Sequence, residues 1–214
     1  MKDIAVFGAG GFGREVACLI KLINKSQEQP EWNIIGFFDD NPELKGTHNE
    51  YGEILGGTDA LNAWPTPLAV VIAIGNPQTV RTIVENVQNE NVNYPNLFAP
   101  STTFLDEENI TFGKGNIICS NCLFSCNVHI GDFNVFNGYI TVGHDATFGN
   151  YNSLMPAVRI SGEVKVGDCN FFGVDAVVLQ QIKIGNDTKI GANSLIIRKT
   201  KDGQTYVGNP AMIL

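Results

Sequence analysis

The stretch IGDFNVFNGYITVGHDATFGNYNSLMPAVRISGEVKV, residues 130–166, repeats a six-residue apolar pattern that decides the fold of this chain. Every sixth residue is apolar at fifteen consecutive positions that extend beyond this stretch on both sides, from Phe112 to Ile196. Because 43% of the chain is apolar, one chosen register would do this by chance about three times in a million. The repeat therefore predicts a solenoid.

A longer period of eighteen residues lies within the six-residue one. Two residue types recur at this step: Gly113, Gly131, Gly149, Gly167 and Gly185, and Asn116, Asn134, Asn152 and Asn170. Three hexads then form one triangular coil with a short strand on each side, and we expect glycine or asparagine with positive φ at the corners. Residues eighteen apart would stack ~4.8 Å above each other. About five such coils fit between Phe112 and Ile196.

The first 100 residues follow a different pattern. Short apolar runs at 4–7, 34–38 and 69–74 predict buried parallel strands. One helical face is indicated by the spacing of Val16, Leu19, Ile20 and Ile23. Pro77 is a suitable first residue for another helix. We therefore expect an α/β domain over residues 1–100, the coil over 101–200 and a tail over 201–214.

Composition limits the possible functions. The net charge is −8, and no cluster of lysines or arginines is present to neutralise nucleic-acid phosphates. No segment approaches the apolar length of a membrane span. Five cysteines, an odd number, without an export signal indicate reduced thiols in the cytoplasm. We expect a cytoplasmic protein with no nucleic-acid partner and no membrane span.

Five motifs in a fixed order carry a resemblance to a known family. They are GAGGFGRE at 8–15, FDD at 38–40, AIGN at 73–76, GHD at 143–145 and VGNPA at 207–211. This order resembles the sugar O-acyltransferases of the sialic acid O-acetyltransferase type, a group that includes the bacterial UDP-amino-sugar N-acetyltransferases. The resemblance implies an α/β N-terminal Rossmann-like domain plus a C-terminal left-handed parallel β-helix of hexapeptide repeats. It also implies a homotrimer that binds acetyl-CoA between subunits and a nucleotide sugar at the N-terminal domain.

The glycine-rich turn is a candidate phosphate site. Gly8, Gly10 and Gly13 form G-x-G-x-x-G between the first strand and a helix, where backbone N–H groups can receive an anion. NAD is one reading, with Asp39 on the ribose, although about 100 residues are few for a full dinucleotide fold. A purely structural turn is another. The resemblance instead implies that the nucleotide sugar contacts Gly10, Gly11, Phe12, Gly13, Asp39, Asp40, Gly75 and Asn76.

Three histidines are available as a catalytic base. His48 and His129 are expected on the surface, whereas His144 precedes Asp145 in a corner of the coil. The ordinary pKa of histidine suits a general base near neutral pH, and a neighbouring carboxylate could fix its tautomer if the chain bends there. A lone histidine is more often structural. The resemblance at Gly-His-Asp implies that His144 and Asp145 are catalytic.

The eighteen-residue repeat adds one candidate site residue, and the resemblance adds others. Gly162 lies eighteen residues after His144, so its N–H could bind an oxyanion there, the role that the family assigns to a matching glycine. Asn137 resembles a residue that contacts the acceptor sugar. Ser153 replaces a histidine of many relatives that approaches the acetyl group. Contacts with acetyl-CoA are further expected at Gly162, Ser153, Gly173, Ala176 and Pro210.

Metal chemistry is disfavoured. Cys119, Cys122 and Cys126 suggest zinc, but the hexad register places Cys122 inside the coil and the other two elsewhere, with no fourth ligand. The γ-class carbonic anhydrases share the β-helix but need three zinc histidines. Here only His129 and His144 lie in the coils. We expect no metal.

The leading hypothesis is direct transfer of an acetyl group from acetyl-CoA to a nucleotide-linked amino sugar or sugar, for surface glycan biosynthesis. One alternative is an NAD-dependent oxidoreductase whose β-helix serves only to form the trimer. Another is a non-catalytic nucleotide-sugar sensor. The sequence leaves the sugar, the nucleotide and the choice between N- and O-acetylation open.

Overall fold

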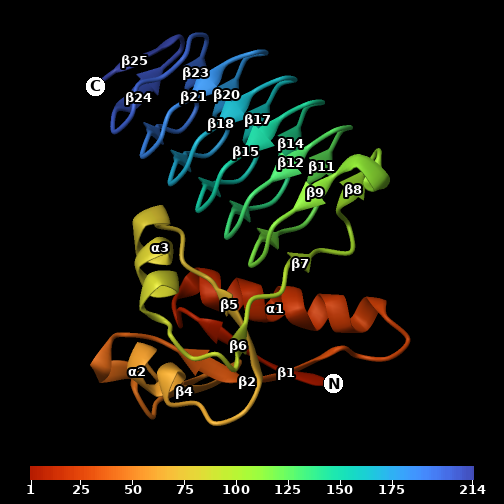
Figure 1. Ribbon diagram of the computed structural model, residues 1–214, viewed down its shortest axis with the longest axis vertical. Coiled ribbons are helices and arrows are strands. Elements are labelled where there is room, and N and C mark those ends of the chain that lie inside the picture. Colours follow the sequence, from red (N-terminus) through yellow and green to blue (C-terminus); the bar gives the residue numbers. More distant parts are fainter. The chain divides into compact units, whose positions relative to one another are not determined.

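The computed structural model describes residues 1–214, and the chain divides into two compact units (Figure 1). The first consists of Met1–Gly75 and Thr79–Pro100. The second consists of Asn76–Gln78 and Ser101–Leu214. No helix in either unit has both the length and the apolar character that a membrane crossing requires.

The first unit is an α/β domain. Its elements are β1 (Lys2–Phe7), α1 (Gly11–Ser26), β2 (Trp32–Phe38), a 3-10 turn (Pro42–Leu44), β3 (His48–Asn49), β4 (Gly52–Gly56), α2 (Thr58–Asn62), β5 (Leu68–Ile72), most of α3 (Pro77–Asn86), β6 (Val92–Asn93) and β7 (Leu97–Phe98). The sheet order is β3-β4-β2-β1-β5-β6, and only β3 and β4 pair antiparallel. The expected strands and helices are confirmed.

This strand order creates a topological switch point at β1. From β1 the chain crosses to β2 on one side and later to β5 on the other. Ligands of open parallel sheets bind at such a switch point, outside the carboxyl ends of the strands. Helix α1 begins at this edge, directly after β1, and packs against β1 and β2 through its apolar stripe, which includes the buried Val16, Ile20 and Ile23.

The second unit is a left-handed parallel β-helix whose strands are two residues long. One side holds β10 (Ile117–Ile118), β13 (Val135–Phe136), β16 (Ser153–Leu154), β19 (Phe171–Phe172) and β22 (Lys189–Ile190). The next holds β8 (Thr103–Phe104), β11 (Leu123–Phe124), β14 (Thr141–Val142), β17 (Arg159–Ile160), β20 (Val177–Val178) and β23 (Leu195–Ile196). The third holds β9 (Thr111–Phe112), β12 (His129–Ile130), β15 (Thr147–Phe148), β18 (Lys165–Val166) and β21 (Lys183–Ile184), stacked in order in Figure 1.

The eighteen-residue register is confirmed on each side of the coil. Ile118, Phe136 and Leu154 pair in succession, for example, as do Val142, Ile160 and Val178. The apolar residues at every sixth position fill the interior: all are buried except Phe112, which is half-buried.

The corners differ from the expectation. The recurring glycines do not take positive φ; left-handed residues instead recur every six positions and are mostly not glycine, as at Phe133, Asp145 and Glu163. A β-carbon on Gly131 would lie 2.5 Å from the carbonyl oxygen of Gly149, so these glycines permit close stacking of successive coils. The eighteen-residue repeat of glycine is therefore real, but it is explained by the close spacing of the coils and not by positive φ at the corners.

The recurring asparagines also lie elsewhere than expected. Asn116, Asn134, Asn152 and Asn170 are buried inside the coil. The Oδ1 atom of each accepts the backbone N–H of the residue eighteen later, at 2.8–3.0 Å, and the ladder ends at Thr188. This ladder satisfies buried polar groups on every coil and holds the coils in register.

The coil begins and ends with irregular elements. A 3-10 turn (Glu107–Asn109) separates β8 from β9. After β23, strand β24 (Thr205–Gly208) pairs parallel with β22, and β25 (Ala211–Ile213) pairs antiparallel with β24. The tail over 201–214 therefore closes the C-terminal end of the coil.

Candidate active site

His144 and Asp145 lie at the corner between β14 and β15. Asp145 has a φ of 58°, in the left-handed region, so the chain bends sharply at this residue. The bend brings the Asp145 carboxylate to the imidazole, with Oδ2 2.7 Å from Nδ1 of His144. The adjacent pair can therefore make the contact that an extended strand would forbid.

The hydrogen bonds of Asp145 define its charge and the histidine tautomer. Its Oδ1 accepts from Nδ2 of Asn127, one coil below, at 3.1 Å. The hydrogen bond with His144, and then that with Asn127, lower the pKa of the Asp145 carboxyl. An ionised Asp145 assigns the proton of a neutral imidazole to Nδ1. Nε2 of His144 is then free to accept a proton, and the His144 side chain is 46% exposed.

Gly162 lies directly over the imidazole, one coil above His144. A β-carbon at Gly162 would lie 2.5 Å from Nε2 and 2.7 Å from Cε1 of His144. The His144 carbonyl accepts a hydrogen bond from the Glu163 N–H at 2.8 Å, and the Gly162 carbonyl accepts one from the Gln181 N–H at 3.0 Å. These two hydrogen bonds hold the corner. The Gly162 N–H itself donates to no group of the chain.

The other predicted residues of the coil lie elsewhere. Asn137 and Gly173 occupy the corner that follows β13 and β19, so within one chain they belong to a different corner of the triangle from His144. Ala176 is fully buried. Ser153, on β16, is 2% exposed, and its hydroxyl has no hydrogen-bond partner. Pro210 lies between β24 and β25, beside a cavity at the end of the coil.

The first unit brings its predicted residues to the carboxyl edge of the sheet. The loops after β1 and β2 are joined because Asp39 Oδ2 accepts the Ala9 N–H at 2.9 Å and Gly8 donates to the Phe38 carbonyl at 2.7 Å. Asp39 Oδ1 accepts the Asn41 N–H at 2.9 Å. Asp39 thus has a structural part in shaping the loops. Gly75 follows β5, next along the same edge, whereas Asn76, the next residue in the chain, belongs to the second unit.

The glycines of the turn fall into two groups. A β-carbon on Gly13 would overlap the Gly8 carbonyl, so Gly13 allows α1 to approach β1. Gly10 and Gly11, by contrast, have no atom within 4 Å of such a β-carbon. No side chain caps the N-terminus of α1 at Gly10, and the half-exposed Phe12 lies within its first turn. The open part of the turn presents free N–H groups that favour an anion.

A cavity of about 590 Å³ opens beside this edge of the first unit. Asp40 lines it and is anchored by Thr58, whose N–H and hydroxyl donate to its carboxylate at 2.6 and 3.0 Å. Sequence reasoning found Asp39 and Asp40 but missed the polar residues that line the rest: Lys45, Thr58, Asp59, Asn62, Asn86 and Gln88. They come from three separate segments, and only the Gly56-Gly57 pair before Thr58 marked a turn there.

The cysteines form no cluster. No group of three histidine, cysteine or acidic side chains is arranged to hold a metal ion. Cys122 lies inside the coil, as the register predicted, and burial raises the pKa of its thiol to about 11. It is therefore a protonated packing residue. His48 and His129 are exposed, as expected.

Comparisons with known proteins address the two units together. The PglD N-terminal domain family matches residues 3–87. The acetyltransferase domain of PglB from Neisseria gonorrhoeae FA1090, solved with acetyl coenzyme A, is 28% identical, with 100% of this chain and 99% of that one covered and a TM-score of 0.88. WeeI from Acinetobacter baumannii AYE is 29% identical over 100% of both chains, with a TM-score of 0.87. Residues 3–87 thus match the PglD N-terminal domain family, and the chain as a whole is similar to solved sugar acetyltransferases along its full length.

A third structure extends this similarity at the level of the fold. PerB from Caulobacter crescentus, in complex with CoA and GDP-perosamine, is 24% identical, with 100% of this chain and 98% of that one covered and a TM-score of 0.86. No curated protein sequence matches the chain. These similarities span both the N-terminal domain and the coil that the motif order indicated.

Proposed function

We propose that this protein transfers the acetyl group of acetyl-CoA to an amine or hydroxyl of a nucleotide-linked sugar, with His144 as general base. The observation that carries the proposal is the stacking of Gly162 over an imidazole whose Nδ1 is held by Asp145. The solved relatives support the two substrates, since one binds acetyl coenzyme A and another binds CoA and GDP-perosamine.

The reaction needs one proton acceptor and one anion-binding group. Nε2 of His144 takes the proton of the acceptor while its nitrogen or oxygen attacks the thioester carbonyl. The Asp145 carboxylate stabilises the imidazolium that forms. When the tetrahedral intermediate collapses, the C–S bond breaks and the proton passes to the sulfur of coenzyme A. No covalent bond to the protein forms.

The oxyanion would be bound by Gly162. Its N–H has no partner in the chain, and the space beside its α-carbon borders Nε2, where the acceptor would approach. A donor of this kind contributes about 100- to 1000-fold to the rate of an acyl transfer.

The nucleotide sugar would bind to the first unit. The open N-terminus of α1 at Gly10 and Gly11 would receive the diphosphate, as helix N-termini do. The cavity beside Asp40 would take the nucleoside. Its volume and its polar lining suit a base and ribose, which hydrogen-bond along several edges.

The complete site would require a second copy of the chain, in a homotrimer. His144 and Asn137 lie at different corners of one coil, so a single chain does not bring both to one acceptor. Packing two coils side by side would place the Asn137 and Gly173 corner of one against the His144 corner of its neighbour. We infer that acetyl-CoA lies in the groove between them.

The remaining predicted contacts with acetyl-CoA follow from this arrangement. Ser153 and Ala176 are both buried, so each would support the groove from within, and the Ser153 hydroxyl has no hydrogen-bond partner in the chain. Pro210 and the tail would lie toward the adenosine end. All five cysteines are free, which suits a reducing cytoplasm.

The experiment is a thiol-release assay with acetyl-CoA and UDP-, dTDP-, GDP- and CMP-linked sugars, each with and without a free amine. Release that depends on one nucleotide sugar, and that Asp145→Asn lowers, is the expected result. Absence of release with every sugar nucleotide, from protein that is folded by circular dichroism, would count against the proposal.

A further inference from the structure

The coil places Arg198 in the same column as His144. Successive pairings of β14, β17, β20 and β23 join Val142, Ile160, Val178 and Ile196. Two residues further on in each coil, the column is His144, Gly162, Gln180 and Arg198. Arg198 therefore lies three coils beyond His144, ~14 Å along the axis.

An apolar strip runs beside this column. Leu179 is 42% exposed and Ile197 is 38% exposed, and each immediately precedes a member of the column. Residues with large exposed aliphatic side chains on consecutive coils are expected to be covered by a partner or ligand. The strip lies on the upper coils, between Gly162 and Arg198.

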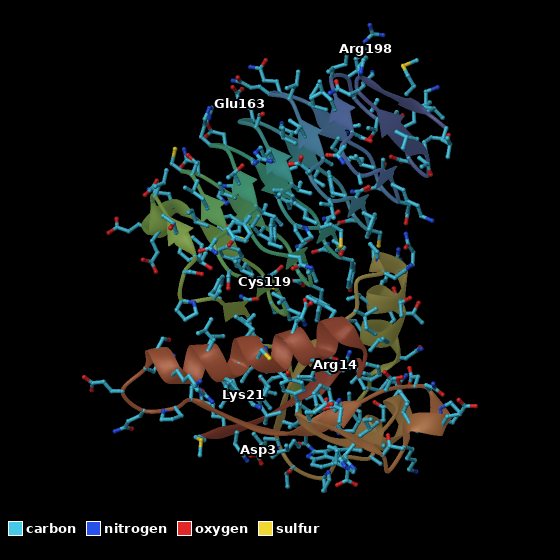
Figure 2. The ribbon with its side chains drawn as sticks, turned by 180° about the vertical axis from the view of Figure 1, so that it is seen from behind. Asp3, Arg14, Lys21, Cys119, Glu163 and Arg198 are labelled. Carbon is cyan, nitrogen blue, oxygen red and sulfur yellow. The ribbon has the colours of Figure 1, made fainter.

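Arg198 is a free cation. The ion pairs of the chain involve Lys2, Arg81, His144 and Arg159, and Arg198 makes neither an ion pair nor a hydrogen bond. A guanidinium without a carboxylate partner is notable in a protein of net charge −8. Figure 2 shows Arg198 and Glu163 projecting outward from the coil, with Arg198 near its C-terminal end.

A cavity of about 540 Å³ adjoins Arg198. It lies between the end of β23 and the hairpin of β24 and β25. Two more cations line it, Lys199 and Lys201, with Tyr206 and Met212 among the other residues, and no carboxylate side chain does. The cavity therefore combines positive charge with apolar surface, which suits a phosphorylated aromatic group.

We propose that Arg198 binds the diphosphate of the acetyl donor and that the adjoining cavity holds its phosphoadenosine. This inference rests on the proposed function, which puts the thioester at His144 and Gly162. About thirteen covalent bonds join the thioester sulfur to the first phosphorus of coenzyme A, a reach of ~15 Å at the ~1.2 Å per bond of an extended chain. That reach matches three coils. The planar guanidinium suits bidentate phosphate binding.

The test compares two acetyl donors in wild type and Arg198→Gln. Acetyl-CoA carries the diphosphate, and acetyl-pantetheine lacks it. Losing a charge-assisted hydrogen bond should raise the KM for acetyl-CoA about ten- to a hundred-fold, leave kcat unchanged and leave the KM for acetyl-pantetheine unchanged. Acetyl-dephospho-CoA, which keeps the diphosphate, should show the same increase. Lys183→Gln, which removes a cation from β21 on another side, should change neither KM.

Calorimetric binding of coenzyme A, without any sugar, separates this inference from the proposed function. Weaker binding to Arg198→Gln than to wild type, with no turnover of any sugar nucleotide, would support Arg198 and count against the acetyl transfer. Equal binding and an unchanged KM would overturn the role of Arg198. So would an equal rise in KM for acetyl-CoA and acetyl-pantetheine, because the contact would then not be with the diphosphate.

Discussion

A β-carbon on Gly162 would lie 2.5 Å from Nε2 of His144, the nitrogen that the Asp145 hydrogen bond leaves free. Any side chain at residue 162 would therefore occupy the space beside Nε2, where the proposed mechanism puts the acceptor. The same absence of a side chain leaves the Gly162 N–H open. In the proposed mechanism, glycine at this position serves both the base and the oxyanion.

Gly162→Ala tests this relationship. The added methyl group displaces the imidazole or blocks Nε2, so kcat/KM should fall about 100-fold or more. Stability should change little, since His144 is half-exposed and able to move. Steady-state thiol release together with thermal unfolding checks both statements. Activity equal to wild type would show that the reacting atoms lie elsewhere.

Asn127→Ala should raise the pKa of Asp145 relative to wild type. The hydrogen bond from Asn127 is the second cause of the lowered pKa, and that with His144, the first, remains. The lowered pKa stabilises the folded state above the ordinary aspartate pKa of about 3.9, and this contribution is lost as pH falls through the folded value. The loss of stability relative to wild type should therefore be larger at pH 6 than at pH 2. Residue 127 has a φ of 54°, so alanine there also adds a cost that does not depend on pH. Carbon-13 titration of the Asp145 carboxyl measures the shift directly; an unchanged pKa would refute the contribution of Asn127.

Gly11→Asp separates a phosphate site from a structural turn. The space around Gly11 is open, and a carboxylate at a helix N-terminus stabilises the helix by about 0.3–1 kcal/mol. The melting temperature should hold or rise while the KM for the nucleotide sugar rises about tenfold or more through charge repulsion. Gln27→Glu makes the same charge change beyond the other end of α1 and should leave that KM unchanged. An unaltered KM in Gly11→Asp would favour the structural reading.

Asn152→Leu tests the buried ladder. Asn152 Oδ1 accepts the backbone N–H of Asn170 at 3.0 Å, and its Nδ2 donates to the Gly167 carbonyl at 2.9 Å. Leucine leaves both groups unpaired, so the free energy of unfolding should fall by about 2–4 kcal/mol. Thr141→Ala, an exposed change in β14 on another side of the coil, should stay within about 0.5 kcal/mol. Equal denaturation midpoints for both variants would contradict a stabilising ladder.

The coil was predictable because its interior repeats locally, so each apolar residue at every sixth position identifies the next. The stacking of residue 162 over residue 144 followed from the same arithmetic. The corner conformation was not predictable: residues such as Phe133 and Glu163 take positive φ because stacking of the coils imposes it, against their own preference. Residue type alone also could not place Asn152 inside the coil, since buried asparagine is stable only with the partners that neighbouring coils provide.

The candidate nucleotide site was only partly predictable. Glycine spacing indicated the turn, and the strand ends indicated Asp39 and Asp40. The use of Asp39 in joining the loops after β1 and β2 depends on a contact between residues thirty apart in sequence. Lys45 and Gln88 come together only through the packing of three segments that have no shared motif.

The most direct test of the account follows the acetyl group itself. Wild type and His144→Ala are each incubated with acetyl-CoA and the nucleotide sugar that supports thiol release, and the sugar product is analysed by mass spectrometry. The account predicts a nucleotide sugar that has gained one acetyl group with wild type, formed at least about 100-fold more slowly by the variant. Formation at the wild-type rate by folded His144→Ala would contradict it.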